Sequence, residues 1–144
     1  MADRRRLRDR GSVLMLVPAG VLVLVMLAGM TFDFAHVYVA QRELADLAES
    51  VANDVATYAV DQPALRREGR VAFDQDRADQ IVALAASVPP SGVRITGLSA
   101  TIDPDSGAVV VTATAEVDPV FLRAIPGEAV PRTVHATAQA TLTR

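Results

Sequence analysis

A long apolar run without a charge dominates the pattern of hydrophobic and polar positions in this chain. It extends over 21 residues, from Ser12 to Phe32, and contains no Asp, Glu, Lys or Arg. Because a helix rises about 1.5 Å per residue, the run makes a helix of about 32 Å, and the hydrocarbon core of a bilayer is about 30 Å thick. The pattern therefore predicts a transmembrane helix over residues 12–32.

A cleaved secretory signal is the alternative interpretation of this run. Such signals usually hold an apolar region of about 7 to 15 residues, followed by a small-x-small cleavage site. The run here is longer, and no such site follows it. The nearest candidate, Leu27-Ala28-Gly29, has a large residue in the first position. We therefore expect a retained membrane anchor.

Beyond the run, apolar residues continue at helical spacing and form a stripe, with polar residues on the opposite side. No Gly or Pro occurs between residues 30 and 62. One continuous helix is therefore predicted from Ser12 to Asp61, with residues 33–61 as an amphipathic extension. The stripe must be covered, either by the protein's own outer domain or by a neighbouring helix of the same kind. It consists of Val37, Leu44, Leu47, Ala48, Val51, Val55 and Tyr58.

A second helix is predicted over about residues 74–88, with Asp74 as its N-cap. Pro89 and Pro90 follow it and prevent its continuation. Residues 62–73 show no clear periodicity, and we interpret them as a linker or a short extra turn. The segment 62–92 thus contains a linker and one helix. The apolar face of that helix consists of Ala78, Ile81, Val82, Ala85 and Val88.

In the remaining segment, residues 93–144, the period changes to two. Residues 107–117 and 132–144 alternate small apolar residues with polar ones, mostly Thr, which is typical of half-buried antiparallel strands. An earlier strand changes phase at Gly97, which indicates a bulge. A hairpin turn is predicted over residues 103–107, with Pro104 at its second position.

These elements predict an α+β fold in which a long N-terminal transmembrane helix continues outside the membrane. A small two-layer domain follows, with a second helix and a three-stranded antiparallel sheet.

The distribution of charge predicts the orientation of the anchor. Residues 1–11 form a basic tail with five Arg against two Asp, whereas residues 33–144 hold nine Arg against fifteen Asp and Glu. Basic flanks stay inside, so we expect a cytoplasmic N-terminus, an extracytoplasmic C-terminal domain and Asp33 at the outer membrane boundary. The tail can also contact anionic membrane lipid, whereas the acidic outer domain argues against nucleic-acid binding. The topology-determining residues are Arg4, Arg5, Arg6, Arg8 and Arg10.

The sequence holds no motif for catalysis. It has no Cys, and His36 and His135 have no neighbouring Cys or second His with which to form a metal site. The segment from Asp103 to Gly107 resembles the start of a calcium loop, but Thr114 stands where the closing Glu is needed. A nucleophile elbow, a phosphate loop and a dinucleotide fingerprint are also absent. We expect a non-enzymatic protein with no cofactor, no metal and no small-molecule substrate.

Two stretches of the chain carry a family resemblance, over roughly residues 9–60 and 107–144. The first has Asp9-Arg10-Gly11-Ser12, the apolar span, Asp33 and Gln41-Arg42 before an Ala-rich helix. The second has the strand 107–117, Val117-Asp118-Pro119, an apolar patch at Phe121 and Leu122, Pro126 and the closing sequence TVHATAQATLT. In this arrangement the chain resembles the TadE/TadG-like proteins of the tight-adherence (Flp) pilus assembly system.

The resemblance implies a minor pilin or pseudopilin that assists pilus assembly. Its partners would be other pilus-assembly membrane proteins or like subunits, bound through helix packing. It also implies a prepilin-type processing junction at Gly11-Ser12, although Gly11 also fits a helix start. Leu16 stands where pilin-like precursors commonly carry a Glu, which argues against incorporation into a filament. The alternative function is a generic bitopic scaffold or sensor protein that acts through a short extracytoplasmic coiled coil.

Overall fold

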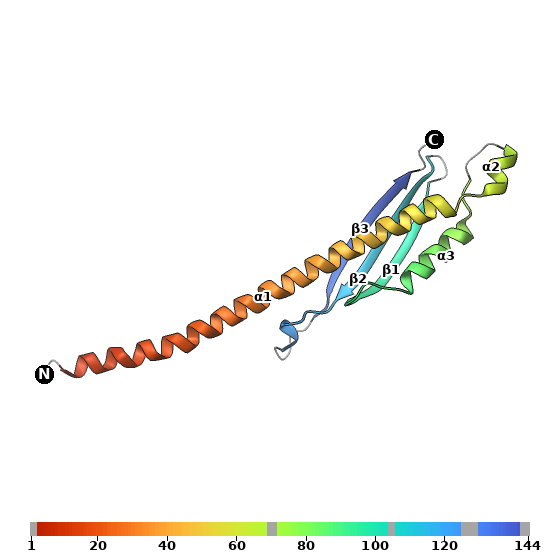
Figure 1. Cartoon of the computed structure of the whole chain (residues 1–144). Helices are drawn as coiled ribbons and strands as arrows, with labels where there is room; N and C mark the ends of the chain where they lie inside the picture. The colour runs from red at the N-terminus through yellow and green to blue at the C-terminus, as the bar shows by residue number, and fades with distance from the viewer. Residues whose placement is uncertain (1–2, 69–71, 104–105, 125–129, 142–144) are drawn as a thin grey trace.

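The computed structural model describes the backbone of residues 3–68, 72–103, 106–124 and 130–141, and in the first helix it describes side chains from Leu16 onward. The fold is α+β, as predicted, with a long apolar N-terminal helix and one three-stranded antiparallel sheet (Figure 1). The elements are α1 (Asp3–Tyr58), α2 (Gln62–Glu68), α3 (Gln75–Ala86), β1 (Val93–Ile102), β2 (Ala108–Val117), the 3₁₀ helix η1 (Leu122–Ala124) and β3 (Arg132–Thr141).

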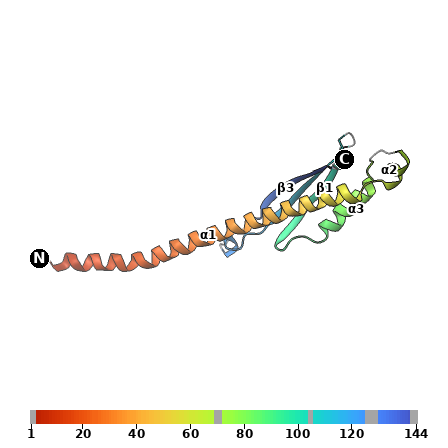
Figure 2. The same cartoon turned by 45° about the horizontal axis from the view of Figure 1, so that its top comes forward.

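Helix α1 is unbroken from Asp3 to Tyr58, and Pro18 lies inside it without ending it. Its first half projects away from the rest of the molecule, and its second half lies on the sheet (Figures 1 and 2). The helix begins at Asp3, earlier than the predicted start at Ser12, and it ends at Tyr58 rather than at Asp61. Asp61 instead accepts a hydrogen bond from the Ala64 N–H at 3.1 Å and so caps α2. We call residues 16–32 the rod, and residues 33–141 the head.

The two helices that follow α1 are short. The segment interpreted as a linker or a short extra turn contains α2, a helix of seven residues. The predicted N-cap of α3 is confirmed, because the Asp74 carboxylate accepts a hydrogen bond from the Arg77 N–H at 3.2 Å. Helix α3 ends at Ala86, ahead of the two prolines, and Ser87 is its C-cap. An isolated bridge between Val60 and Phe73 brings the start of α3 back to the end of α1.

The sheet has the strand order β1-β2-β3, and both strand pairs are antiparallel. The register of β1 against β2 shifts between Ile95 and Gly97, which confirms the predicted bulge. The hairpin between these strands closes with Gly107 at a positive φ of 68°, a conformation that favours glycine. The predicted role of Pro104 in this turn lies outside the described residues.

The head has two layers, with the helices on one face of the sheet. Helix α1 covers β2 and β3, and α3 lies beside α1 and covers β1. Small side chains make up most of the core, so helix and sheet approach each other closely. The other face of the sheet carries polar residues such as Ser99, Thr112 and Thr137, which are register partners across the three strands. The sheet residues buried in this core are Val93, Val109, Val111, Ala113, Ala115, Val117, Val134, Ala136 and Ala140.

The apolar stripe of α1 lies against this sheet rather than against a neighbouring molecule. Leu44, Ala48, Val51 and Val55 are buried, and Val37 and Leu47 are partly buried against them. Tyr58, however, is 64% exposed, so its assignment to the stripe is wrong.

The geometry of the helix explains this error. Residues seven apart drift by about 20° per repeat on a straight helix, and Tyr58 is three repeats from Val37. The buried face instead turns in the opposite sense along the helix, as a row of buried residues at steps of four shows, because each step of four rotates by about 40°. This row consists of Ala40, Leu44, Ala48, Ala52 and Ala56.

Candidate functional site

The best-defined site lies where the rod meets the head. There, Gly29 and Asp33 of α1, one helical turn apart, meet residues 118–122, which connect β2 to η1. We call this contact the junction. Gly29 is buried and Asp33 is only 6% exposed, whereas the other rod residues are exposed. The junction is therefore the first point along the described side chains of α1 at which the helix is covered by protein.

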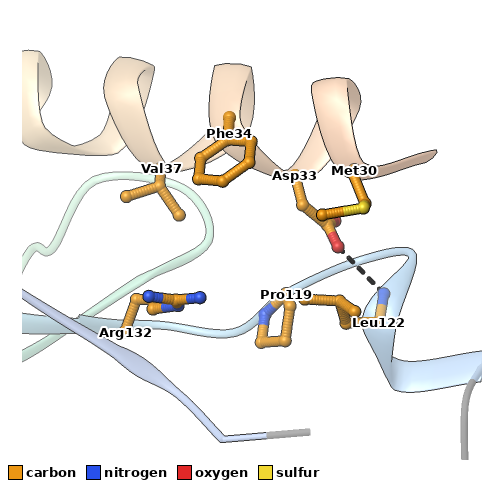
Figure 3. Close-up of a pocket in the computed structure, with 7 residues that line it drawn as sticks. All are labelled: Met30, Asp33, Phe34, Val37, Pro119, Leu122 and Arg132. Atoms are coloured by element: carbon orange, nitrogen blue, oxygen red, sulfur yellow. Dashed lines mark hydrogen bonds between the residues drawn. The ribbon is translucent and has the colours of Figure 1, made fainter. Parts of the chain in front are cut away.

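The Asp33 carboxylate holds the connecting segment through three backbone hydrogen bonds. Its Oδ1 atom accepts from the N–H of Val120 at 2.9 Å and from that of Phe121 at 2.8 Å. Its Oδ2 atom accepts from the N–H of Leu122 at 2.9 Å, the bond drawn in Figure 3. Leu122 is the first residue of η1, so the carboxylate also lies at the N-terminus of that short helix. One side chain thus fixes three consecutive residues.

This environment changes the acidity of Asp33. The hydrogen bond from Phe121 contributes most to lowering its pKa below the ordinary value, and those from Leu122 and Val120 contribute further. Burial acts in the opposite direction, and the neighbouring His36 favours the charged form. The lowered pKa means that Asp33 binds the segment as a carboxylate.

Gly29 provides the second half of the junction, because its missing side chain leaves room for an aromatic ring. A Cβ atom placed on Gly29 would overlap the ring of Phe121. Gly20, in the same helix, has no neighbouring atom within 4 Å of the equivalent position. The close approach at Gly29 therefore requires glycine, whereas the position of Gly20 does not.

A small cavity of about 60 Å³ lies beside Asp33 (Figure 3). Its apolar wall comes from α1 and from the connecting segment, and Arg132, the first residue of β3, completes it. The volume suits about two water molecules rather than an organic ligand. The lining residues are Met30, Asp33, Phe34, Val37, Pro119, Leu122 and Arg132.

The structure places the predicted site residues in three groups. Asp33 directly follows the apolar run, as expected, but the sequence did not predict its burial or its three amide partners. The stripe lies in the head core, except Tyr58. Gly11 and Ser12 lie within the helical backbone of α1, and their side chains lie outside the described part. The same holds for the five arginines of the basic tail, Arg4, Arg5, Arg6, Arg8 and Arg10.

The junction joins residues that are far apart in the chain, which is why the sequence analysis missed it. Asp33 is separated from its amide partners by 87 to 89 residues, and the partners contribute backbone groups that leave no pattern in the sequence. The available signal was the four-residue spacing of Gly29, Asp33 and Val37, which extends the buried face of α1 toward the N-terminus of that helix. The spacing indicates that a covered face exists, without identifying what covers it.

Two further observations bear on what the chain can do. Among the side chains that the structure describes, no three His, Cys, Asp or Glu residues lie close enough together to hold a metal ion. In the same part of the chain, one helix, α1, is long and apolar enough to cross a membrane by length and composition.

Comparisons of this chain with protein-family models, with curated proteins and with solved structures find no match. The candidate site is therefore defined by its geometry and by the chemistry of its residues.

Proposed function

We propose that this protein is a non-enzymatic single-pass membrane protein that assists the assembly or function of a Tad/Flp-type pilus or secretion apparatus. Residues 12–32 of α1 cross the membrane, the basic tail is cytoplasmic, and the head lies outside. The observation that carries the proposal is the division of α1 into two parts. Its first part is apolar and uncovered, and its second part is buried in the head.

The uncovered surface of the rod supports a membrane location. Leu16, Leu22 and Leu24 are each more than 60% exposed, and almost every other large apolar residue of the rod is about half exposed or more. An apolar surface of this extent is rare on soluble monomers and usually marks an interaction surface. Lipid is the partner that suits this helix, because its described side chains are uncovered from Leu16 to Ala28, about 20 Å, within an apolar run long enough to span a bilayer.

The junction supports the family assignment. The two stretches that carry the resemblance to TadE/TadG-like proteins lie at opposite ends of the sequence. Asp33 belongs to the first, and the segment from Val117 through Leu122 belongs to the second. In the structure these elements bind each other directly. A shared role in fixing the head to the rod gives a physical reason for their joint occurrence.

The alternative of a coiled-coil scaffold receives less support from this arrangement. A coiled coil between copies would need the stripe from Val37 to Val55 on the surface. Here the stripe packs against the protein's own sheet. Two surfaces stay available for partners in the proposed role. The rod can contact other proteins within the membrane, and the polar face of the sheet can contact proteins outside it.

Deletion of the gene in the source organism tests the proposal. We expect loss of surface pili, counted by electron microscopy and in sheared surface fractions, and restoration by the full-length chain. A copy whose rod is replaced by a cleavable signal peptide should be secreted without restoring pili. Normal piliation in the deletion strain contradicts the proposal.

Intact mass measurement of the protein from native membranes tests the predicted processing junction. A chain that starts at Ser12 indicates prepilin-type processing after Gly11. A chain that retains the tail indicates that the protein is not processed and acts as an accessory protein.

A further inference from the structure

We infer that the outer leaflet of the bilayer covers the junction, with Val120 and Phe121 inserted at the outer edge of the hydrocarbon layer. The head would then contact the membrane twice, through the rod and through the segment that follows β2. This inference rests on the proposed membrane span and adds a lipid-binding surface to it.

The depth of the junction follows from the length of the rod. Arg10 is the last charged residue before the apolar run, and Gly29 follows 19 residues later. At about 1.5 Å per residue this separation is about 28 Å, slightly less than the hydrocarbon thickness of about 30 Å. Gly29 therefore lies at the outer edge of the hydrocarbon, and any tilt of the helix places it deeper. Shifting the rod outward would draw Arg10 and Arg8 into the lipid, which charged side chains resist.

The connecting segment must share this depth because it touches the same turn of the helix. The ring of Phe121 lies directly on Gly29, and the amides of Val120 to Leu122 bind Asp33 one turn further out. If residues 12–32 span the bilayer, Phe121 lies within its outer boundary.

The backbone donors of the segment are satisfied, which is part of what such a place requires. Irregular backbone is tolerated at membrane depth only where its polar groups are satisfied by protein. Pro119 has no N–H, and the next three N–H groups all donate to Asp33. From Pro119 to Leu122 the chain therefore presents no free backbone donor. The same bonds surround the Asp33 carboxylate with amides, which lowers the cost of its position next to lipid.

The exposed side chains around the junction are of the kinds that occur at a membrane interface. Val120 is 53% exposed, and Phe34 and Tyr38 of α1 are 65% and 69% exposed. Aromatic residues of this kind concentrate at the level of the lipid headgroups. Arg123 and Arg132 lie nearby with exposed side chains, where they can reach lipid phosphates.

Tryptophan fluorescence tests this placement, because the chain contains no Trp of its own. Three single variants of the full chain are reconstituted into vesicles of phosphatidylcholine and phosphatidylglycerol whose acyl chains are brominated near the headgroup in one sample and near the chain end in another. Val120→Trp reports on the segment, and Leu22→Trp reports on the rod. Thr137→Trp, on the exposed polar face of the sheet, is the control for a water-facing position. Circular dichroism checks that each variant folds.

We expect the Val120→Trp emission to be blue-shifted and to lose most of its intensity on bromination, while Thr137→Trp is unaffected. Quenching of Leu22→Trp alone overturns the inference and leaves the proposed membrane span intact. Absence of quenching in Leu22→Trp shows that the span itself is wrong. A blue shift of Val120→Trp without quenching indicates that a second copy covers the segment, which also overturns the inference.

A cysteine variant provides a second measurement. The introduced thiol is unique because the native chain has no Cys, and its side chain is smaller than that of Trp. In the same vesicles, Val120→Cys should react several-fold more slowly with a charged maleimide than Thr137→Cys. Equal rates contradict the inference.

Discussion

Gly29 and Gly20 lie in the same apolar helix, and their different surroundings make them a matched pair for substitution. We predict that Gly29→Ala weakens the junction by about 1–3 kcal/mol, the usual cost of forcing an extra methyl into packed space. The ring of Phe121 occupies that space. Hydrogen exchange of the Phe121 and Leu122 amides, which Asp33 protects, measures the loss as a lower opening free energy.

Gly20→Ala is the control, because its methyl group meets nothing within 4 Å. It should leave the exchange of both amides unchanged within about 0.5 kcal/mol. Adding Phe121→Ala to Gly29→Ala should remove the overlap. Phe121→Ala should therefore lower the opening free energy less in the Gly29→Ala background than in the native chain. Equal exchange in the two glycine variants would show that the contact at Gly29 is unimportant.

The lowered pKa of Asp33 makes the junction sensitive to acid. A carboxylic acid whose pKa is lower in the folded state than in the unfolded state stabilises the folded state at pH values above its unfolded-state pKa. This stabilisation disappears as the pH falls through the folded-state pKa. We predict that Asp33→Asn lowers the urea midpoint of the head at neutral pH. The difference from the native chain should shrink as the pH falls below the ordinary titration range of aspartate.

Asp46→Asn, at an exposed position of the same helix, is the control for the loss of one carboxylate from α1. Its urea midpoint at neutral pH should stay close to that of the native chain. A difference between Asp33→Asn and the native chain that stays constant with pH contradicts the assigned role of the carboxylate.

Single residues could be assigned from the sequence where their role was local. Asp74 was predicted as an N-cap because a cap binds the backbone three residues away, and Gly97 was predicted as a bulge because the alternation changes phase there. Asp33 was recognised only as the first charge after the apolar run. Its amide partners lie 87 to 89 residues away and could come from any loop.

At the scale of elements, α1 and α3 each carry a leucine that tests how the helices pack. Leu44 is fully buried between α1 and the sheet, whereas Leu84 on α3 is 71% exposed. We predict that Leu44→Ala lowers the free energy of unfolding of the head by about 2–5 kcal/mol, because the cavity adds to the lost burial. Leu84→Ala should change it by less than about 0.5 kcal/mol. Urea unfolding in detergent, followed by circular dichroism, measures both, and similar losses would contradict the described packing.

The predicted elements agree with the structure in kind and differ at their limits. The strands and α3 follow from periodicity and from the stop signals around them. The end of α1 was misplaced by three residues because Asp61 was interpreted as part of the stop signal of α1, whereas its side chain caps α2. The seven-residue pattern misplaced Tyr58 because the buried face of α1 turns around the helix along its length, in the sense opposite to the drift of a seven-residue repeat.

At the scale of the whole molecule, the charge asymmetry predicts one orientation in the membrane. Protease added outside spheroplasts should digest the head beyond Asp33 and leave an N-terminal fragment that contains the basic tail. An antibody tag at each end distinguishes the fragments. We expect the same result at high salt, because topology is fixed during insertion. Digestion of the tail in intact spheroplasts contradicts the orientation.

If residues 12–32 span the membrane as proposed, the continuity of α1 also limits how far this protein can act from the lipid. The helix is unbroken between the apolar run and the head, and it rises by only about 40 Å between Asp33 and Tyr58. A component that binds the head alongside α1 would then lie within that distance of the bilayer, and only α2 extends beyond the end of α1 (Figure 1). A tilt of the anchor would swing the head sideways as a rigid lever, so crowding of the anchors would also dictate how neighbouring heads face one another.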